Sequence, residues 1–324
     1  MGLGDDRLSP TLRPLVALAG TIAAFSNASD DILLRFAGVR LSAGTVWAVA
    51  EQAGADLLAF TDVGGVVAPL PLGKPWDFTL PEGKGSVGYI GLDAFSVPMQ
   101  NPDATKADWR MMYLGVLYTP DKKHSEYIAG WDLDVVASKL RCCATERGFG
   151  RADRLVAVMD GGNGLEDAIH RHFNDGVPCI LDWYHAVEHL CDYAKSAWPG
   201  DEAKRTEWSG RAKGVLHDRG GSGLVRWLRR HELPAAGDGL RLLVGYFERN
   251  EHRTDYPTYR ESGLDIGSGP TEAGCKVVGA RLKGSGMRWC EEGAERIAVL
   301  RALYESGPEV WDGFWESTRQ RRAA

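Results

Sequence analysis

Three acidic residues have sequence surroundings that favour a divalent-metal site. Asp93 lies inside a predicted strand at 86–97, although strands covered on both faces are normally apolar. Asp160 ends a second predicted strand and is followed by two glycines, at the strand end where α/β sheets bind ligands. Glu272 stands near the start of a predicted helix, where a glutamate is favoured by the helix dipole. Taken alone, either aspartate is better explained as a turn cap or helix cap, and Glu272 by its favourable place in a first helical turn, but together they predict a shared site.

These carboxylates are expected to bind two Mg²⁺ (or Mn²⁺) ions, because both metals prefer oxygen ligands. Two such ions about 4 Å apart hold the attacking and leaving oxygens of a phosphoryl transfer. The sequence has neither the glycine-rich loop of nucleotide hydrolases nor the turn motif that carries a serine nucleophile. Metal-dependent phosphoryl transfer is therefore the predicted chemistry.

A short polar motif, Asp182-Trp-Tyr-His185, follows the next predicted strand. His185 and His189 share one face of the following helix, a spacing that can bind zinc, but the His-Glu-x-x-His motif is absent. We expect His185 to contact a metal or a phosphate instead. Asp182 is expected to cap the helix or to orient the imidazole.

Basic residues follow Glu272 closely, without an acidic residue between 273 and 289. They are Lys276, Arg281, Lys283 and Arg288. Lys276 and Lys283 are seven residues apart and share a helix face. Next to a carboxylate site, this segment suits a polyanionic backbone such as DNA, and a solvated helix face is the alternative.

The elements that would position these residues form an α/β layer with a mixed sheet. The order is three strands, then helix, strand, helix and strand. The strands are expected at 86–97, 109–118, 126–130, 154–160 and 178–182, and the helices between them at 133–146 and 164–173. Residues 186–260 and 268–305 are predicted to be helical, the latter with a break at 284–286. Trp198, Trp208 and Trp227 in the first of these segments are explained equally by DNA contact and by core packing.

The N-terminal residues 10–57 are predicted to be helical throughout. A short helix ending near Phe36, a turn at Gly38 and a further helix after Ser42 fit a helix-turn-helix. The last of these helices has no Lys or Arg to meet phosphates, so a bundle used for packing or self-association is the alternative.

Composition excludes several classes of protein. With 324 residues, 44% of them hydrophobic and 25% charged, the chain falls in the globular range rather than the disordered or fibrous one. No apolar run approaches the roughly 18 residues of a membrane span. The net charge of −6 argues against coating nucleic acid through bulk charge, although basic residues outnumber acidic ones from 201 to 260. The six cysteines form no Cys-x-x-Cys pair, which predicts reduced thiols and a cytoplasmic protein.

Two motifs resemble a known family. Val-Met-Asp-Gly-Gly-Asn-Gly around Asp160, followed by Asp-x-x-His at Asp182 and His185, resembles the core of Mutator-like DDE transposases. The block Gly-Ser-Gly-Pro-Thr-Glu-Ala-Gly-Cys-Lys around Glu272 is similar to bacterial ISKra-type insertion-sequence transposases, as is Arg-Leu-Lys-Gly-Ser-Gly-Met-Arg-Trp after it. The similarity covers roughly residues 86–316.

The resemblance implies a ribonuclease-H-like fold with a helical insertion and an N-terminal helical, helix-turn-helix-like region. Asp93, Asp160 and Glu272 would be the three metal-binding catalytic acids, with His185 as a further catalytic residue. Asp182, Lys276, Arg281, Lys283 and Arg288 would contact DNA. The corresponding division is an N-terminal region at 1–60, a linker at 61–85, a first core segment at 86–190, an insertion at 191–262 and a second core segment at 263–324.

The implied function is cleavage of element ends and their transfer to target DNA, in a bacterial cytoplasmic, nucleoid-associated protein. Double-stranded DNA is the expected partner, and the chain is expected to act on it as at least a homodimer, without a membrane. A structure-selective nuclease of the same fold and an inactive DNA-binding remnant are the alternatives. The segment before the sheet is shorter than is usual in this group, which leaves open a further upstream DNA-binding segment.

Overall fold

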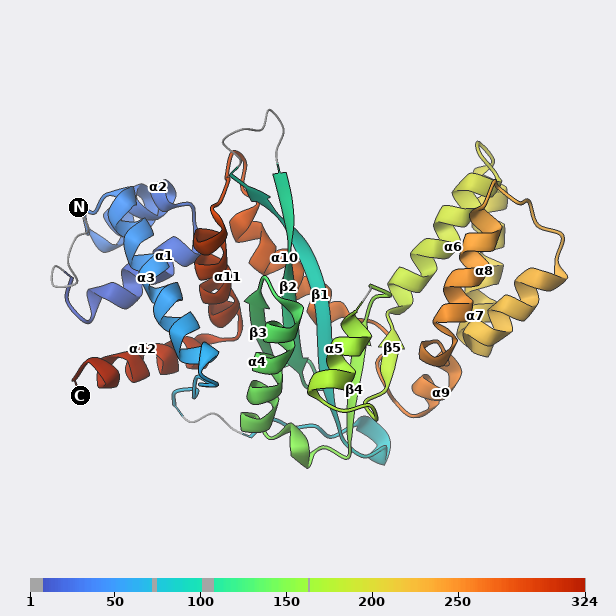
Figure 1. Ribbon diagram of the computed structural model, residues 1–324, viewed down its shortest axis with the longest axis horizontal. Coiled ribbons are helices and arrows are strands. Elements are labelled where there is room, and N and C mark those ends of the chain that lie inside the picture. Colours follow the sequence, from blue (N-terminus) through green and yellow to red (C-terminus); the bar gives the residue numbers. More distant parts are fainter. Residues whose placement is uncertain (1–7, 72–74, 101–107, 163, 324) are drawn as a thin grey trace. The chain divides into compact units, whose positions relative to one another are not determined.

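The protein has an α/β fold with a five-stranded mixed sheet (Figure 1). The computed structural model describes residues 8–71, 75–100, 108–162 and 164–323. The strands are β1 (Val87–Met99), β2 (Asp108–Tyr118), β3 (Ser125–Gly130), β4 (Arg154–Met159) and β5 (Cys179–Leu181), in the order β3-β2-β1-β4-β5. The pairing of β2 with β3 is antiparallel, whereas β4 is parallel to both β1 and β5. The predicted mixed sheet is thus confirmed, and each strand lies within about two residues of its predicted bounds.

The chain forms two compact units, which we call unit 1 and unit 2. Unit 1 comprises Met1–Asp77, Leu92–Arg151 and Pro270–Ala324, and unit 2 comprises Phe78–Gly91 and Ala152–Gly269. The strand β1 contributes its first residues to unit 2 and the rest to unit 1.

Unit 1 combines helices from both ends of the sequence with β2, β3 and most of β1. Its helices are α1 (Leu12–Ile22), α2 (Phe25–Asn27) with the π-helix Ala28–Phe36 after it, α3 (Ala43–Asp62), α4 (Leu133–Glu146), α10 (Gly269–Leu282), α11 (Glu291–Glu305) and α12 (Pro308–Ala323). Short 3-10 turns occur at Pro81–Gly83 in unit 2 and at Phe149–Arg151 in unit 1. Helix α11 packs against α3 and β3, and α4 packs on β2 and β3. The helix predicted at 133–146 is confirmed with the same bounds, because Asp132 caps it by accepting a hydrogen bond from the Val135 amide at 3.0 Å.

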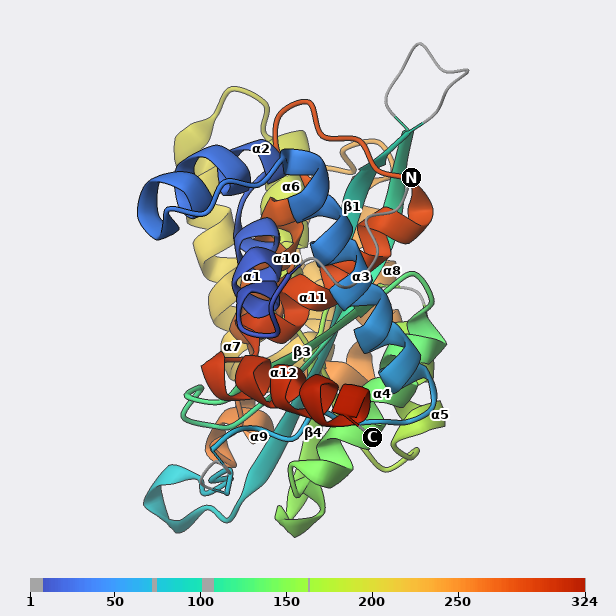
Figure 2. The ribbon, with the colours of Figure 1, turned by 90° about the vertical axis from the view of Figure 1, so that its left-hand side faces the viewer.

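Helix α3 is a packing element of unit 1. It begins where predicted, after Ser42, whose hydroxyl accepts a hydrogen bond from the Thr45 amide at 3.1 Å. Figures 1 and 2 both show it beside α11. At Gly54 the backbones are so close that a Cβ would lie 2.2 Å from the carbonyl oxygen of Arg296. The structure therefore favours the packing interpretation of this helix over one in which it reads DNA.

Replacing Gly54 with alanine should destabilise unit 1 by about 1–3 kcal/mol, because the methyl group has no space and α3 must move away from α11. The matched control is Gly44→Ala in the first turn of the same helix, where the nearest atom would lie at 3.8 Å. That control should be neutral or slightly stabilising, since alanine is the better helix former. Urea denaturation followed by circular dichroism measures both changes, and equal midpoints would contradict the packing argument.

Unit 2 places a set of helices after the parallel strands β4 and β5. They are α5 (Leu165–His172), α6 (Trp183–Ala197), α7 (Glu202–Arg230), α8 (Gly239–Arg249), the 3-10 turn Glu251–Arg253 and α9 (Tyr256–Glu261). The predicted helical character of 186–260 is confirmed, and helices α6, α7 and α8 pack on one another (Figure 1).

The tryptophans of this helical segment form an aromatic cluster. The Trp208 ring lies 5.6 Å from that of Trp198 and 6.0 Å from that of Trp227, and Trp208 is buried. These contacts support the core-packing interpretation of the three residues. Over the described part of the chain, no helix has the length and apolarity needed to cross a membrane.

Candidate functional site

Asp160 begins a tight turn at the carboxyl end of β4. Its half-buried carboxylate accepts a hydrogen bond through Oδ1 from the Gly162 amide at 2.8 Å. Gly164, which precedes α5, has a φ of +83°, a backbone conformation that glycine adopts without strain. The local sequence thus fixes the carboxylate of Asp160 at a strand end, as predicted.

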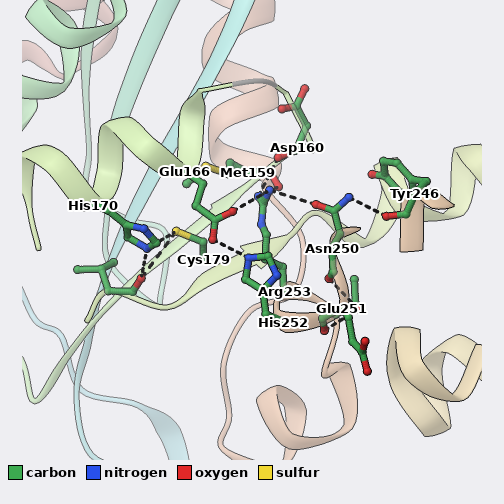
Figure 3. Close-up of polar contacts among 12 residues, drawn as sticks. Met159, Asp160, Glu166, His170, Cys179, Tyr246, Asn250, Glu251, His252 and Arg253 are labelled. Carbon is green, nitrogen blue, oxygen red and sulfur yellow. Dashed lines mark hydrogen bonds and ion pairs between the residues drawn. The ribbon is translucent and has the colours of Figure 1, made fainter. Parts of the chain in front are cut away.

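Arg253 holds the same turn from the backbone side (Figure 3). Its Nη2 donates to the carbonyl oxygens of Asp160 at 2.8 Å and of Met159 at 3.4 Å. The side chain is only 3% exposed, and its Nη1 lies 3.8 Å from the Glu166 carboxylate. A buried guanidinium needs such acceptors and a counter-charge. Arg253, from the end of the helical segment, is therefore a positioning residue for Asp160.

Tyr246 of α8 lies near the polar residues at the ends of β4 and β5. Its ring centroid is 3.8 Å from that of His189 and 6.4 Å from that of His185. Burial raises the pKa of Tyr246 well above its usual value, and the charge of Asp160 raises it further. The buried hydroxyl has no hydrogen-bond partner among the described residues. The side chain therefore remains a neutral phenol at all physiological pH values.

Asp182 is a helix cap. It is 5% exposed, and its carboxylate accepts hydrogen bonds from the amides of His185 at 2.7 Å and Ser268 at 2.5 Å. The first bond caps α6 and confirms the capping alternative; the second joins the start of α6 to the residues just before α10. With both oxygens committed to backbone amides, Asp182 acts on this site by positioning.

His185 is partly exposed on the first turn of α6. Its Nδ1 lies 3.7 Å from the Glu188 carboxylate, and its ring contacts that of His189 edge to face. Burial lowers the pKa of His189, and His185 lowers it further. The imidazole of His189 is therefore harder to protonate than usual, and the side chain of His185 is about 36% exposed.

In unit 1, Glu272 and the residues after Asp93 line one hollow. The carboxylate of Asp93 is half-buried in β1 and accepts a hydrogen bond from the adjacent Ala94 amide at 2.7 Å. The hollow of about 560 Å³ is lined by residues of β1, β2 and α10: Ala94, Phe95, Ser96, Met111, Glu272, Cys275, Lys276, Ala280 and Lys283. Glu272 is exposed in the first turn of α10, and its Oε1 pairs with Lys276 Nζ at 2.7 Å. Glu272 thus lines this hollow, whereas Asp93 directly precedes the β1 residues that line it.

The predicted basic segment divides between surface and core. Lys276 and Lys283 line the hollow, and Arg288 is exposed. Arg281 instead is 5% exposed, and its Nε and Nη2 donate to the carbonyl oxygen of Gly20 at 3.0 and 2.8 Å. Burial lowers the pKa of Arg281 to about 10. Its hydrogen-bonding groups serve the packing of α10 on α1, so Arg281 is not part of the DNA-contacting set that we propose below.

Glu166, His170 and Cys179 form a second cluster, in unit 2. Within the described ranges, they are the one group of three such side chains whose ligand atoms all lie within 4.8 Å of one another. Cys179 Sγ lies 3.7 Å from His170 Nε2, and Glu166 Oε1 lies 2.9 Å from His252 Nε2 (Figure 3). Burial raises the pKa of Cys179 to about 12, with Glu166 contributing, so its thiol is protonated at neutral pH.

In comparisons with known proteins, no family model matches this chain, and neither does any curated protein.

Sequence reasoning missed the contributions of Arg253, Tyr246 and the Glu166 cluster. Arg253 and Tyr246 are far from Asp160 in sequence and reach it only through the fold. A local signal did exist for the cluster, because Glu166 and His170 are four residues apart and Cys179 begins the next strand.

Proposed function

We propose that this protein is a DDE transposase that cuts DNA strands at the ends of an insertion element and joins them to a target. The proposal includes a ribonuclease-H-like core, double-stranded DNA as substrate and a chain acting as at least a dimer on DNA. Asp93, Asp160 and Glu272 are the proposed ligands of two Mg²⁺ (or Mn²⁺) ions.

The observation that carries the proposal is the register of two parallel strands. Ile90 of β1 is paired with Ala157 of β4. Asp93 follows Ile90 by three residues, and Asp160 follows Ala157 by three residues. The two aspartates thus stand at equal offsets in sequence from a registered pair of residues, which supports proposing a shared role for them.

The chemistry of the donors fits the proposed metal. All three side chains offer carboxylate oxygens, which Mg²⁺ prefers, and each is at least partly exposed. Two bound ions would activate a water or a 3′ hydroxyl and stabilise the negative charge on the leaving oxygen.

The other residues have supporting roles in this proposal. The Gly162 amide and the Arg253 guanidinium fix the turn that carries Asp160. Lys276 balances the charge of Glu272 and, with Lys283, provides cations for DNA phosphates. In this proposal the partly exposed imidazole of His185 donates a hydrogen bond to a phosphate oxygen, and Asp182 fixes the start of its helix. Arg288 is a further surface cation for the DNA backbone.

The deciding experiment is a strand-transfer assay with the full chain. Its DNA substrates carry the sequences that flank the reading frame on each side, with a pre-cut 3′ end and a supercoiled plasmid as target. The expected result is joined product in Mg²⁺ or Mn²⁺ and none in EDTA. Cleavage without joining would replace this proposal with a nuclease. Metal-independent DNA binding without either reaction would replace it with an inactive remnant.

A further inference from the structure

We propose that Glu166, His170 and Cys179 bind one Zn²⁺ ion that stabilises unit 2. These three residues are distinct from the proposed magnesium ligands. They combine a carboxylate, an imidazole and a thiol, which is a donor set that zinc accepts and that Mg²⁺ does not. The inference goes beyond the proposed function and does not depend on it.

The distances between the donor atoms fit a zinc ion. Tetrahedral zinc with bonds of about 2.3 Å to sulfur and about 2.05 Å to nitrogen separates the two donors by about 3.6 Å. Cys179 Sγ and His170 Nε2 are 3.7 Å apart, and all three donor atoms fall within 4.8 Å of one another. An ion can therefore be bound with small side-chain adjustments, leaving a fourth position for water.

The side chains of His170 and Cys179 have poor hydrogen-bond partners. His170 Nε2 lies 3.3 Å from the carbonyl oxygen of Val177, and Cys179 Sγ lies 3.7 Å from it. The first contact is longer than a typical N–H···O hydrogen bond of about 2.9–3.0 Å. Buried polar groups, such as those around the 5% exposed thiol of Cys179, normally make hydrogen bonds of better geometry. Metal coordination provides these groups with a partner.

The framework around the cluster is suited to a structural ion. Glu166 and His170 lie one turn apart on α5, and Cys179 is the first residue of β5. His252 Nε2 contacts the Glu166 carboxylate at 2.9 Å, an outer contact of the kind that orients metal ligands. Zinc would bind the Cys179 sulfur as thiolate and release the thiol proton to solvent. The ion would thereby join α5 to β5 and strengthen the contact with the turn that carries Arg253.

Cobalt(II) provides a test that needs no DNA. Titration of the metal-free chain with Co²⁺ should produce a thiolate-to-cobalt charge-transfer absorption, and Zn²⁺ but not Mg²⁺ should displace the signal. Zn²⁺ should also raise the melting temperature, because it binds the folded state alone. Cys179→Ser should abolish the absorption, whereas Cys191→Ser, a control in the same unit, should retain it.

Two further variants, Glu166→Gln and His170→Gln, remove a proposed zinc ligand but keep the Cys179 thiol. They test the site even if Cys179→Ser fails to fold. Each should weaken zinc binding at least about 10-fold, judged by competition with a chromophoric chelator. No thiolate absorption with the folded wild-type chain would overturn the inference, as would full absorption in Cys179→Ser. Because these readouts require neither DNA nor strand transfer, a failed strand-transfer assay would leave them unaffected.

Discussion

Asp160→Asn should reduce Mg²⁺-dependent DNA cleavage and joining by about 10³-fold, which corresponds to roughly 4 kcal/mol of lost transition-state stabilisation. The amide keeps an oxygen that can accept the Gly162 hydrogen bond, so the turn after β4 should persist. What is lost is the negative charge that a divalent ion requires. Rates should be measured on pre-cut and uncut substrates, with DNA binding in Ca²⁺ measured separately.

The control for this substitution is Asp167→Asn, an exposed aspartate of α5 that undergoes the same change of charge. It should retain near wild-type rates. Glu272→Gln should match the Asp160→Asn loss, and its own control is Glu292→Gln. Glu292 also stands in the first turn of a helix of unit 1 and pairs with Arg296 four residues later, at 3.0 Å. Wild-type activity in both Asp160→Asn and Glu272→Gln would contradict the catalytic assignment.

Glu126→Gln should lower the free energy of unfolding by about 3–5 kcal/mol, because it leaves a buried guanidinium without its counter-charge. Arg147 Nε and Nη2 donate to the two oxygens of Glu126 at 2.5 and 3.0 Å, and both side chains are buried. Arg147 Nη2 also donates to the carbonyl oxygen of Val67 at 2.7 Å, which ties the segment before the sheet to β3 and α4. Chemical denaturation measures the loss.

The matched control is Asp238→Asn, which breaks an equally clear ion pair with Arg241 in which both side chains are about 72% exposed. Water and salt screen that pair, so no measurable change is expected. The double variant Glu126→Leu with Arg147→Met should recover part of the stability lost in Glu126→Gln, since no unpaired charge remains buried. Equal denaturation midpoints for Glu126→Gln and Asp238→Asn would contradict the claim that the buried ion pair contributes more to the free energy of unfolding than the exposed one.

Much of the fold could be predicted from local patterns. Apolar strands bounded by turns, and caps such as Ser42, Asp132 and Asp182, determine where elements begin, and these signals act over a few residues. The π-helix Ala28–Phe36 was expected only as an ordinary helix, since both share nearly the same apolar spacing.

The surroundings of the candidate site could not be predicted in the same way. Arg281 shows why: it is rotated by about 140° from Lys276 around the helix, yet only the packing of α10 on α1 decides that this face is buried. Arg253 contacts Asp160 across 93 positions of sequence, which no local periodicity reports. The sequence alone supports the three acids as candidates, and their joint coordination of metal stays a prediction.

The hydrogen bonds from Arg253 to the carbonyl oxygens of Met159 and Asp160 have a consequence for protein engineering. A truncated variant that excised the helices after β5 as a dispensable module would also discard the guanidinium that anchors the end of β4. Any minimised scaffold must therefore retain the 3-10 turn Glu251–Arg253, or graft an equivalent donor pair onto the new linker.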